Sequence, residues 1–216
     1  SPSDKLLYRG EVFRGPLKFT PVASGYMVVN HISLEDYLLG TLGAEMSASW
    51  KTEALRAQAV ASRTYALYRI AHPKHREFDL ESTVQDQVYQ GVMAEDPRIR
   101  DAVSSTKNQI LILNDRPIQA FFHSRCGGAT ESAEKVWQIR GQTAMTKVSC
   151  PYCEKFPYVW KAFISAKEFL TAFKLPFNGT FQLGPGSRLP SGRLASLRVE
   201  TPGQKLDVPA ESIRSY

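Results

Sequence analysis

The fold is decided by residues 33–71, which read SLEDYLLGTLGAEMSASWKTEALRAQAVASRTYALYRIA. Residues 33–36 resemble a capping box ahead of an apolar run, which predicts that a helix begins there. A second helix is predicted from Ser49 or Thr52 up to the residues before Pro73, because this stretch is rich in alanine, which favours helix and permits close packing. The chain is therefore expected to contain a central pair of helices.

The residues on either side of this pair predict strands, hairpins and further helices. Apolar residues alternate loosely between Gly and Pro turns, which is typical of antiparallel strands. Strands are predicted within 6–32, at 87–89, and near 194–199 and 205–208. Two further strands, 110–113 and 118–122, are predicted to form a hairpin around 114–117. Helices are predicted at 97–106 and 166–173. This order lacks regular βαβ alternation. It predicts an α+β fold, with antiparallel strands and hairpins packed around the helical pair in a single domain of residues 1–216.

Length and composition exclude several classes of protein. The chain has 216 residues, of which 43% are hydrophobic and 22% charged, so disorder and collagen are excluded. No apolar run approaches the roughly 20 residues of a membrane span. The net charge is +6, and residues 141–216 hold 10 basic against 5 acidic side chains, scattered singly. A nucleic-acid-binding domain has only this charge in its favour, because basic clusters with interleaved aromatics are missing. A mild attraction to an anionic polymer fits better.

Glu45 is a carboxylate at a position where the first helix should be apolar. Leu34, Leu38 and Leu42 form the apolar stripe at spacings of four residues. Glu45 follows Leu34 by 11 residues and Leu38 by 7, so helical geometry places it about 20° from the same line. The spacing therefore predicts a carboxylate on the buried face of the helix.

Burial would suit Glu45 to acid chemistry. A buried carboxyl group loses hydration, which raises its pKa unless a cation pairs with it, and a general acid must carry a proton near neutral pH. The spacing also fits a frayed helix end or a salt bridge to Arg56 or Arg63. Gly40 and Gly43 flank the position and leave room for another backbone or a ligand.

Seven motifs in this order, over roughly residues 26–160, resemble the SpoIID/LytB family. They are LEDYLLG at 34–40, AEMSASW at 44–50, EALRAQAVASRTYA at 53–66, QVYQG at 87–91, FHS at 122–124, GGATE at 127–131 and EKVW at 134–137. The resemblance implies a cell-envelope protein that acts on peptidoglycan, with any signal or anchor removed from this chain. It also implies a lytic transglycosylase, which cleaves the bond between N-acetylmuramic acid and N-acetylglucosamine in peptide-denuded glycan strands and leaves an anhydro-muramic end.

The resemblance also implies roles for individual residues. The family's essential acid matches Glu45, and its important arginine matches Arg63, which either orients Glu45, binds a sugar substituent, or forms a structural ion pair with Asp36 or Glu53. Gln87 and Tyr89 either line a sugar groove or belong to an ordinary edge strand. Further substrate-binding residues are expected in the later motifs: Ser124, Gly128 and Thr130.

A second hypothesis comes from another functional class. Some members of the family are known as enhancers of a cell-wall amidase, which implies a non-catalytic module that binds peptidoglycan and acts through a partner. The sequence also departs from the family pattern in three places. Residues 81–86 lack the Cys and His of a zinc cluster found in some relatives, and 143–145 replace a Pro-Tyr-Leu segment. A Gly-His-Gly-Val-Gly-Met-type segment is not reached before Tyr216, so a fragment or a shortened member is expected.

Three cysteines and one histidine suggest a structural metal. His123 and Cys126 are separated by two residues, as are Cys150 and Cys153, and this spacing suits a tetrahedral Zn²⁺ site. The alternatives are one disulfide from Cys126 to Cys150 or Cys153, with one thiol left over, and a His123 that faces substrate. Catalysis by a single carboxylate is expected to require no cofactor.

Overall fold

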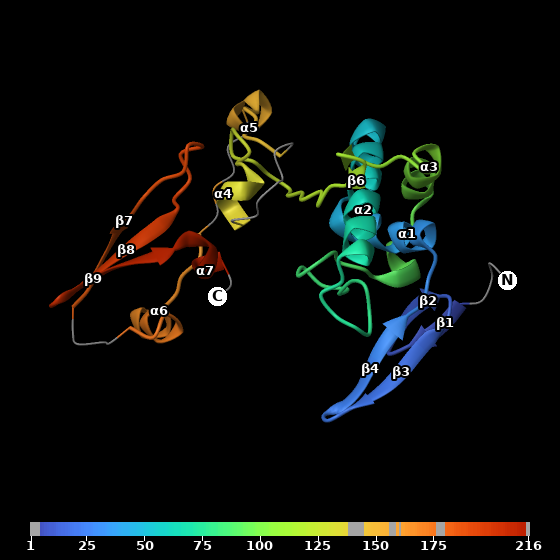
Figure 1. Ribbon diagram of the computed structural model, residues 1–216, viewed down its shortest axis with the longest axis horizontal. Coiled ribbons are helices and arrows are strands. Elements are labelled where there is room, and N and C mark those ends of the chain that lie inside the picture. The colour runs from blue at the N-terminus through green and yellow to red at the C-terminus, as the bar shows by residue number, and fades with distance from the viewer. Residues whose placement is uncertain (1–4, 138–144, 156–158, 160, 176–179, 215–216) are drawn as a thin grey trace. The chain divides into compact units, whose positions relative to one another are not determined.

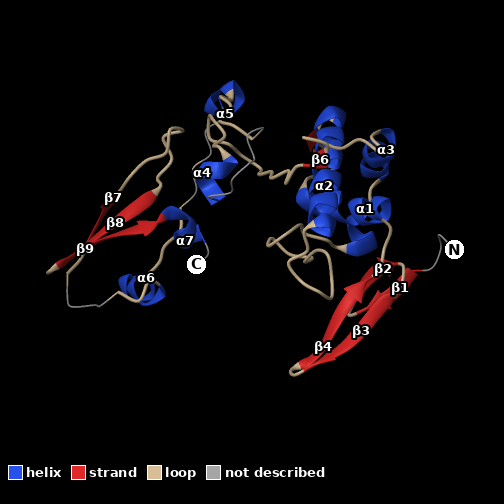
Figure 2. Ribbon diagram, in the orientation of Figure 1, coloured by secondary structure: helices blue, strands red, loops and turns tan. Residues whose placement is uncertain are grey.

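The computed structural model of the chain describes residues 5–137, 145–155, 159, 161–175 and 180–214 (Figure 1). They group into two compact units, the first Ser1–Phe122 and the second His123–Tyr216. Helices and antiparallel strands mix in both units without βαβ order (Figure 2), so the α+β prediction is confirmed. The single domain over 1–216 stays a prediction. None of the helices in the described residues is long and apolar enough to cross a membrane.

Two β-hairpins open the first unit. β1 (Lys5–Tyr8) pairs antiparallel with β2 (Glu11–Arg14), and β3 (Leu17–Val22) pairs antiparallel with β4 (Gly25–Asn30). Each pair is a two-stranded sheet of its own. The short antiparallel strands predicted within residues 6–32 are confirmed.

The two predicted central helices follow the hairpins. α1 (Leu34–Glu45) begins where the capping residue indicates, because Ser33 Oγ accepts the backbone N–H of Asp36 at 3.2 Å. α2 (Thr52–Ala71) begins at one of the two expected positions and ends before Pro73. Both helices are therefore confirmed, and Glu45 is the last residue of α1.

A third helix completes the core of the first unit. α3 (Pro97–Ser105) packs against both α1 and α2, so three helices rather than a pair surround the core. The fully buried residues of this core are Leu38, Leu39, Leu42, Leu55, Ala59, Ile99, Ala102 and Val103. The sequence pattern predicted α3 as a helix but did not place it in the core.

The chain between α2 and α3 is largely irregular. It ends in a short 3₁₀ helix, η1 (Gly91–Ala94). The strand predicted at 87–89 is wrong, because the N–H of Val88 binds the side chain of Glu45 and that of Tyr89 binds the carbonyl oxygen of Ser82. The backbone donors of this segment are thus used by separate partners rather than by a neighbouring strand.

An ion pair fastens this segment to the second strand. Arg14 on β2 donates from Nε and Nη2 to the carboxylate of Glu95 at 2.5 and 2.8 Å, and Arg100 donates to the same carboxylate at 2.8 Å. The Arg14 and Glu95 side chains are only 18% and 10% exposed. The Arg14 hydrogen bond holds the pKa of Glu95 below its usual value, against the opposing effect of burial.

The predicted second hairpin is shorter than expected. β5 (Ile112–Leu113) pairs with β6 (Arg116–Pro117), so the turn consists of Asn114 and Asp115 alone. Both turn residues have positive φ, 51° and 60°, which is typical of the two-residue turn that Asn and Asp favour. The predicted strand at 118–122 is wrong, because the strand begins at Arg116 and ends after two residues.

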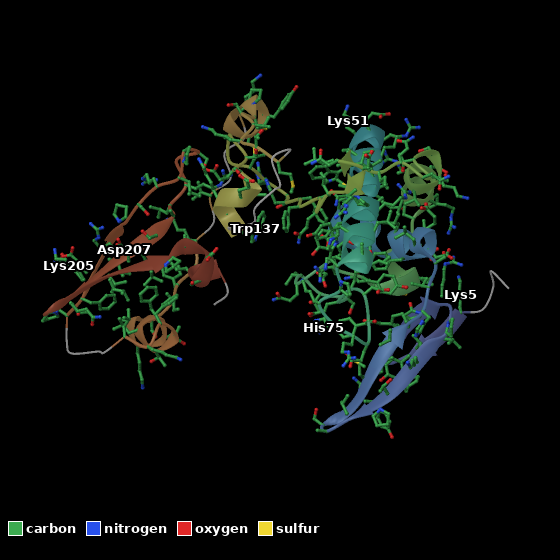
Figure 3. All side chains as sticks on the ribbon, in the orientation of Figure 1. Lys5, Lys51, His75, Trp137, Lys205 and Asp207 are labelled. Carbon is green, nitrogen blue, oxygen red and sulfur yellow. The ribbon has the colours of Figure 1, made fainter. Side chains whose placement is uncertain are left out.

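The second unit is built on a three-stranded antiparallel sheet. Its elements are α4 (Ala133–Trp137), α5 (Pro151–Lys155), α6 (Ala166–Ala172), β7 (Gln182–Pro185), β8 (Ser196–Thr201), β9 (Gln204–Pro209) and α7 (Ala210–Arg214). The sheet order is β7-β8-β9, and Lys205 and Asp207 mark β9 (Figure 3). The second unit's core comprises Phe169, Leu170, Val199 and Val208. The helix predicted at 166–173 and the two strands predicted near 194–199 and 205–208 are confirmed.

Candidate active site around Glu45

The carboxylate of Glu45 is half-buried at the end of α1 and is held by a backbone donor. The N–H of Val88 donates to Oε1 of Glu45 at 2.8 Å. Among the described residues, Oε2 has no hydrogen-bond partner. Arg56 and Arg63, the two expected salt-bridge partners, pair instead with Glu53 and Glu35. One oxygen of the carboxylate is therefore fixed, and the other remains available for chemistry.

Gln87 holds in place the segment that binds Glu45. Its side chain is completely buried, and its Oε1 accepts a hydrogen bond from the hydroxyl of Tyr37 at 3.1 Å. Tyr37 and Glu45 both lie on α1 and both contact this segment, Tyr37 through Gln87 and Glu45 through Val88. Burial raises the pKa of Tyr37, which keeps its hydroxyl a donor. The structure thus buries Gln87 against Tyr37, and its predicted role in substrate binding stays a prediction.

Tyr89 lies between α1 and the first unit's strands. Its ring stacks on Tyr37 with centroids 5.3 Å apart, and its hydroxyl donates to Oδ1 of Asn30 on β4 at 2.9 Å. Burial raises the pKa of Tyr89 to about 12. The ring is half-buried and belongs to the wall of the pocket described below, and the role of Tyr89 in a sugar groove stays a prediction.

Gly40 and Gly43 allow this segment to approach α1 closely, as the sequence predicts. A methyl group on Gly40 would lie 2.5 Å from the ring of Tyr89, and one on Gly43 would overlap the carbonyl oxygen of Ala94. The backbone N–H of Gln90 also donates to the carbonyl oxygen of Gly40 at 3.2 Å. The close approach is made by a backbone and an aromatic ring of the chain itself.

Asp86 fixes the start of the same segment, and sequence reasoning missed it. Its side chain is 1% exposed and accepts hydrogen bonds from Lys74 at 2.7 Å, from the hydroxyl of Tyr65 at 2.8 Å and from the N–H of Glu81 at 3.0 Å. Burial alone would raise the pKa of Asp86, but these hydrogen bonds outweigh it and lower the pKa. Asp86 directly precedes Gln87 in the QVYQG motif, which is the signal that could have identified it.

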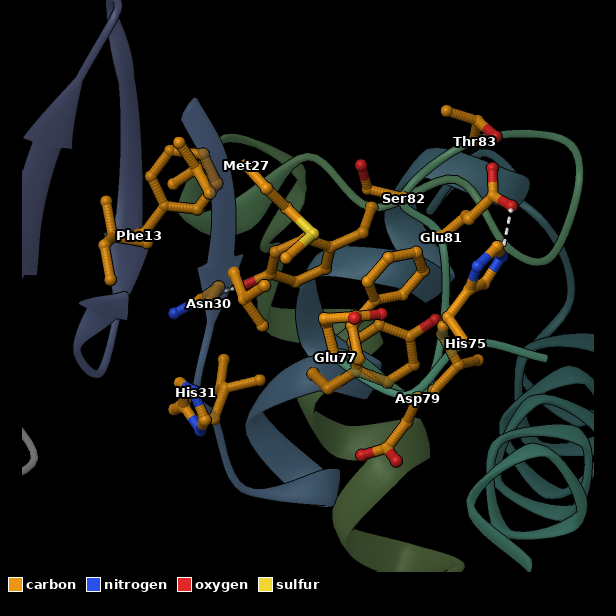
Figure 4. Close-up of a pocket in the computed structure, with 18 of the residues that line it drawn as sticks. Phe13, Met27, Asn30, His31, His75, Glu77, Asp79, Glu81, Ser82 and Thr83 are labelled. Carbon is orange, nitrogen blue, oxygen red and sulfur yellow. Dashed lines mark hydrogen bonds and ion pairs between the residues drawn. The ribbon is translucent and has the colours of Figure 1, made fainter. Parts of the chain in front are cut away.

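A pocket of about 1020 Å³ lies in the first unit, lined by the first two hairpins, residues 73–83, Tyr37 and Tyr89 (Figure 4). Its lining combines aromatic rings with several acidic side chains, and His75 both pairs with Glu81 at 3.2 Å and stacks on Phe78. Glu45 is not among the lining residues, but α1 connects it to Tyr37 at the pocket wall. The sequence pattern gave no sign of this pocket.

Residues 22–113 match the family model described as SpoIID, Stage II sporulation protein. The stage II sporulation protein D of Bacillus subtilis is 31% identical over 211 residues, which cover 88% of this chain and 58% of that protein. The chain belongs to the SpoIID/LytB family. An uncharacterized protein of Brachyspira hyodysenteriae is 39% identical over 137 residues, or 63% of this chain and 37% of that protein.

A further relative carries a different name. The amidase enhancer of Bacillus subtilis is 37% identical over 100 residues, which cover 46% of this chain and 13% of that protein. The SpoIID/LytB chain described here therefore spans less than two thirds of the length of each of these three relatives.

Arg63 of this SpoIID/LytB chain lies inside the first unit. It is 1% exposed, and its Nε and Nη2 donate to the two oxygens of Glu35 at 2.8 and 2.9 Å. It also donates to the carbonyl oxygens of Val103 and Gln109 at 3.1 and 3.2 Å and to Oγ1 of Thr106 at 3.5 Å. These contacts match the structural ion pair that the sequence left open, with Glu35 in place of Asp36 or Glu53. They do not bring Arg63 to Glu45.

The remaining predicted substrate-binding residues belong to the second unit. Ser124 is exposed, and Gly128 is half-buried and accepts the N–H of Cys150 through its carbonyl oxygen. The hydroxyl of Thr130 accepts the N–H of Val148 at 2.8 Å, so it stabilises a loop pairing. Their roles in substrate binding stay predictions. Thr143 and Ala144, which stand where the family has a Pro-Tyr-Leu segment, lie outside the described residues.

The three cysteines of this SpoIID/LytB chain are close together. Their sulfur atoms lie within 4.8 Å of one another, and His123, which is exposed, is not part of this cluster. Burial raises the pKa of the Cys126 thiol, whereas the hydrogen bond with Cys126 lowers the pKa of Cys153 to about 7. The expected four-residue ligand set is thus reduced to three in this structure.

Proposed function

We propose that the chain is part of a cell-envelope protein that acts on peptidoglycan, and that its first unit is a lytic transglycosylase with Glu45 as general acid and then general base. The observation that carries the proposal is the half-buried carboxylate of Glu45, fixed through Oε1 by the Val88 N–H at 2.8 Å. A fixed carboxylate with one unpartnered oxygen is the arrangement that proton transfer to a bound substrate requires.

A single carboxylate is sufficient for this reaction. The protonated Oε2 of Glu45 gives its proton to the glycosidic oxygen while the bond from that oxygen to C1 of N-acetylmuramic acid breaks and an oxocarbenium-like centre develops. The carboxylate then takes the proton of the muramic acid's own 6-hydroxyl, whose oxygen bonds to C1 and closes the anhydro ring. Water is not consumed, and no second carboxylate is needed, in contrast to glycoside hydrolysis.

The pocket of the first unit offers a surface suited to sugars. The stacked rings of Tyr37 and Tyr89 present aromatic faces, and Asn30 on β4 supplies an amide beside them. Pockets that combine apolar faces with a few polar groups are typical of small-ligand and sugar sites. Tyr37 and Glu45 both lie on α1, about 12 Å apart along the helix, and a glycan strand that binds at Tyr37 and continues along α1 would reach the carboxylate.

The enzyme proposal is tested by digestion of denuded and peptide-bearing glycan strands, with products weighed by mass spectrometry. Wild type should release anhydro-muramic products, and Glu45→Gln should lose them while the fold is kept, because the amide oxygen still accepts the Val88 N–H. Glu53→Gln is the matched control, since the Glu53 side chain is 80% exposed and pairs only with the neighbouring Arg56 among the described residues. Equal activity of wild type and Glu45→Gln would refute the proposal.

A second candidate function follows from the relative named amidase enhancer. In that case the chain binds peptidoglycan without cleaving it and increases the activity of a cell-wall amidase. Pull-down on purified glycan and an amidase assay with added chain separate the two functions. A non-catalytic module would leave glycan intact, and wild type and Glu45→Gln would enhance the amidase equally.

A further inference from the structure

The second unit contains a cluster of three sulfur atoms that the proposed reaction does not use. Cys126 and Cys153 are 27 positions apart, yet their Sγ atoms are 3.3 Å apart. The Sγ atom of Cys150 joins them, and all three lie within 4.8 Å of one another. Cys126 is buried, and the other two are half-buried. None of the three belongs to the second unit's core.

The conformation of the backbone brings the three cysteines together. Gly127 and Gly128 follow Cys126 with φ of 63° and 110°, a conformation that glycine adopts without strain, and they turn the chain sharply. The N–H of Cys150 then donates to the carbonyl oxygen of Gly128 at 2.7 Å, which brings the second cysteine beside the first. α5 begins immediately afterwards and carries Cys153. The sulfur atoms of two segments that are far apart in sequence thus lie side by side.

The spacing of the sulfurs suits a tetrahedral metal ion. Zn²⁺ binds thiolate sulfur at about 2.3 Å, which places two sulfur ligands of a tetrahedral site about 3.8 Å apart. The separation of 3.3 Å between Cys126 and Cys153 is close to this value, and all three sulfur atoms lie within 4.8 Å of one another. A disulfide requires one pair at about 2.05 Å and would leave the third sulfur unused within the same cluster.

We propose that Cys126, Cys150 and Cys153 bind one Zn²⁺ ion as three thiolates, with the fourth position filled by water or an external ligand. Each thiol releases its proton to solvent as its sulfur–zinc bond forms. His123 is exposed and outside the cluster, so it is not among the protein ligands. The ion fastens the turn at 126–128 to the start of α5 and so stabilises the fold of this part of the second unit.

The test measures zinc in the chain purified without chelator under anaerobic conditions, by elemental mass spectrometry. About one zinc per chain is expected, and Cys153→Ser should lose nearly all of it. Ser124→Ala is the matched control, because Ser124 is exposed beside the site and carries no sulfur, so it should keep the zinc. His123→Ala should also keep it. Loss of zinc in His123→Ala would overturn the three-thiolate assignment in favour of a four-residue site.

A second measurement uses wild type alone, because a cysteine variant can fail to fold. The metal is removed from the reduced chain, and Co²⁺ is added, which gives thiolate-to-metal charge-transfer absorption only when sulfur binds it. This absorption should appear with Co²⁺ and disappear when Zn²⁺ displaces it. Its absence from the folded, reduced chain would overturn the proposal. A purified wild-type mass lower by two hydrogens would overturn it as well, since that mass shows a disulfide.

Discussion

The backbone N–H of Val88 donates to Oε1 of Glu45 at 2.8 Å, across 43 positions of sequence. This bond connects the end of α1 to the QVYQG motif, and both belong to the motifs that carry the family resemblance. Because the donor belongs to the backbone, no substitution at Val88 except proline removes it. The position of the carboxylate therefore depends on the residues that hold residues 86–91 against α1.

Gln87→Leu should reduce turnover without weakening substrate binding. The substitution removes the acceptor of the Tyr37 hydroxyl inside the protein, so the Val88 N–H is no longer held in register, at a cost of roughly 1–3 kcal/mol in stability. We expect kcat on denuded glycan to fall while KM stays near the wild-type value. Tyr37→Phe, which removes the other partner, should change kcat in the same direction. A rise in KM with unchanged kcat would instead show direct contact between Gln87 and substrate.

Arg63→Met should destabilise the first unit rather than weaken glycan binding. Loss of one partner leaves Glu35 in a partly buried site without its cation, which costs about 3 kcal/mol in the free energy of unfolding. Denaturant unfolding measures this cost. Pairing Arg63→Met with Glu35→Gln should recover part of the stability. If Arg63→Met unfolds like wild type but binds glycan less tightly, the arginine acts on substrate.

Gly43→Ala should destabilise the contact between α1 and η1. The new methyl group would overlap the carbonyl oxygen of Ala94, and such overpacking costs roughly 1–3 kcal/mol. Gly184→Ala is the matched control, because a methyl group there meets no atom within 4 Å. Thermal unfolding of the two variants should differ clearly, and equal melting temperatures would contradict the close packing.

The pair of Arg14 and Glu95 should make the first unit acid-sensitive. Because the folded-state pKa of Glu95 lies below its ordinary 4.5, the pair's contribution to stability is complete above that pH and is lost as pH falls through the folded value. Glu95→Gln should cost about 2 kcal/mol near neutral pH and flatten the pH dependence of unfolding below 4.5. An unchanged acid profile in Glu95→Gln would assign the sensitivity to other carboxylates.

Tyr89→Phe and Tyr89→Ala should separate the ring from its hydroxyl. Phenylalanine keeps the stacking on Tyr37 but loses the hydrogen bond to Asn30, which costs about 1 kcal/mol in stability and leaves glycan binding intact. Alanine removes the aromatic face and should weaken glycan binding several-fold. Calorimetric titration with denuded glycan fragments measures both. Equal affinity of wild type and Tyr89→Ala would exclude this ring from the binding surface.

Helical spacing predicted much of the first unit because its signals are local. The capping residue Ser33 and the leucine stripe located α1, and the same periodicity placed Glu45 partly inside. The strand at 87–89 was predicted wrongly, since β-type residues there are held by a side chain and a distant carbonyl rather than by a strand. Local pattern cannot show which partner a backbone N–H will find.

The sequence also could not show which residues pair with the buried charged side chains. The sequence left open whether Arg63 orients Glu45, binds a sugar substituent or pairs with Asp36 or Glu53, and the fold brings Glu35 to it. Asp86 was overlooked because nothing in its local sequence shows that Tyr65 and Lys74 converge on it. The cysteine spacing did predict a cluster, but spacing alone could not show that His123 lies outside it.

Residues 74–86 form a loop that contributes one wall of the pocket, and the ion pair between Lys74 and Asp86 closes this loop. The carboxylate of Asp86 thus holds both ends of the loop. The residues between its ends contribute to the pocket lining and are not part of the helical core. Changes in the length or charge of residues 76–80 alter what the pocket accepts while its fastening stays intact. Exchange of this loop is therefore a route to a different ligand preference that leaves the helical core unchanged.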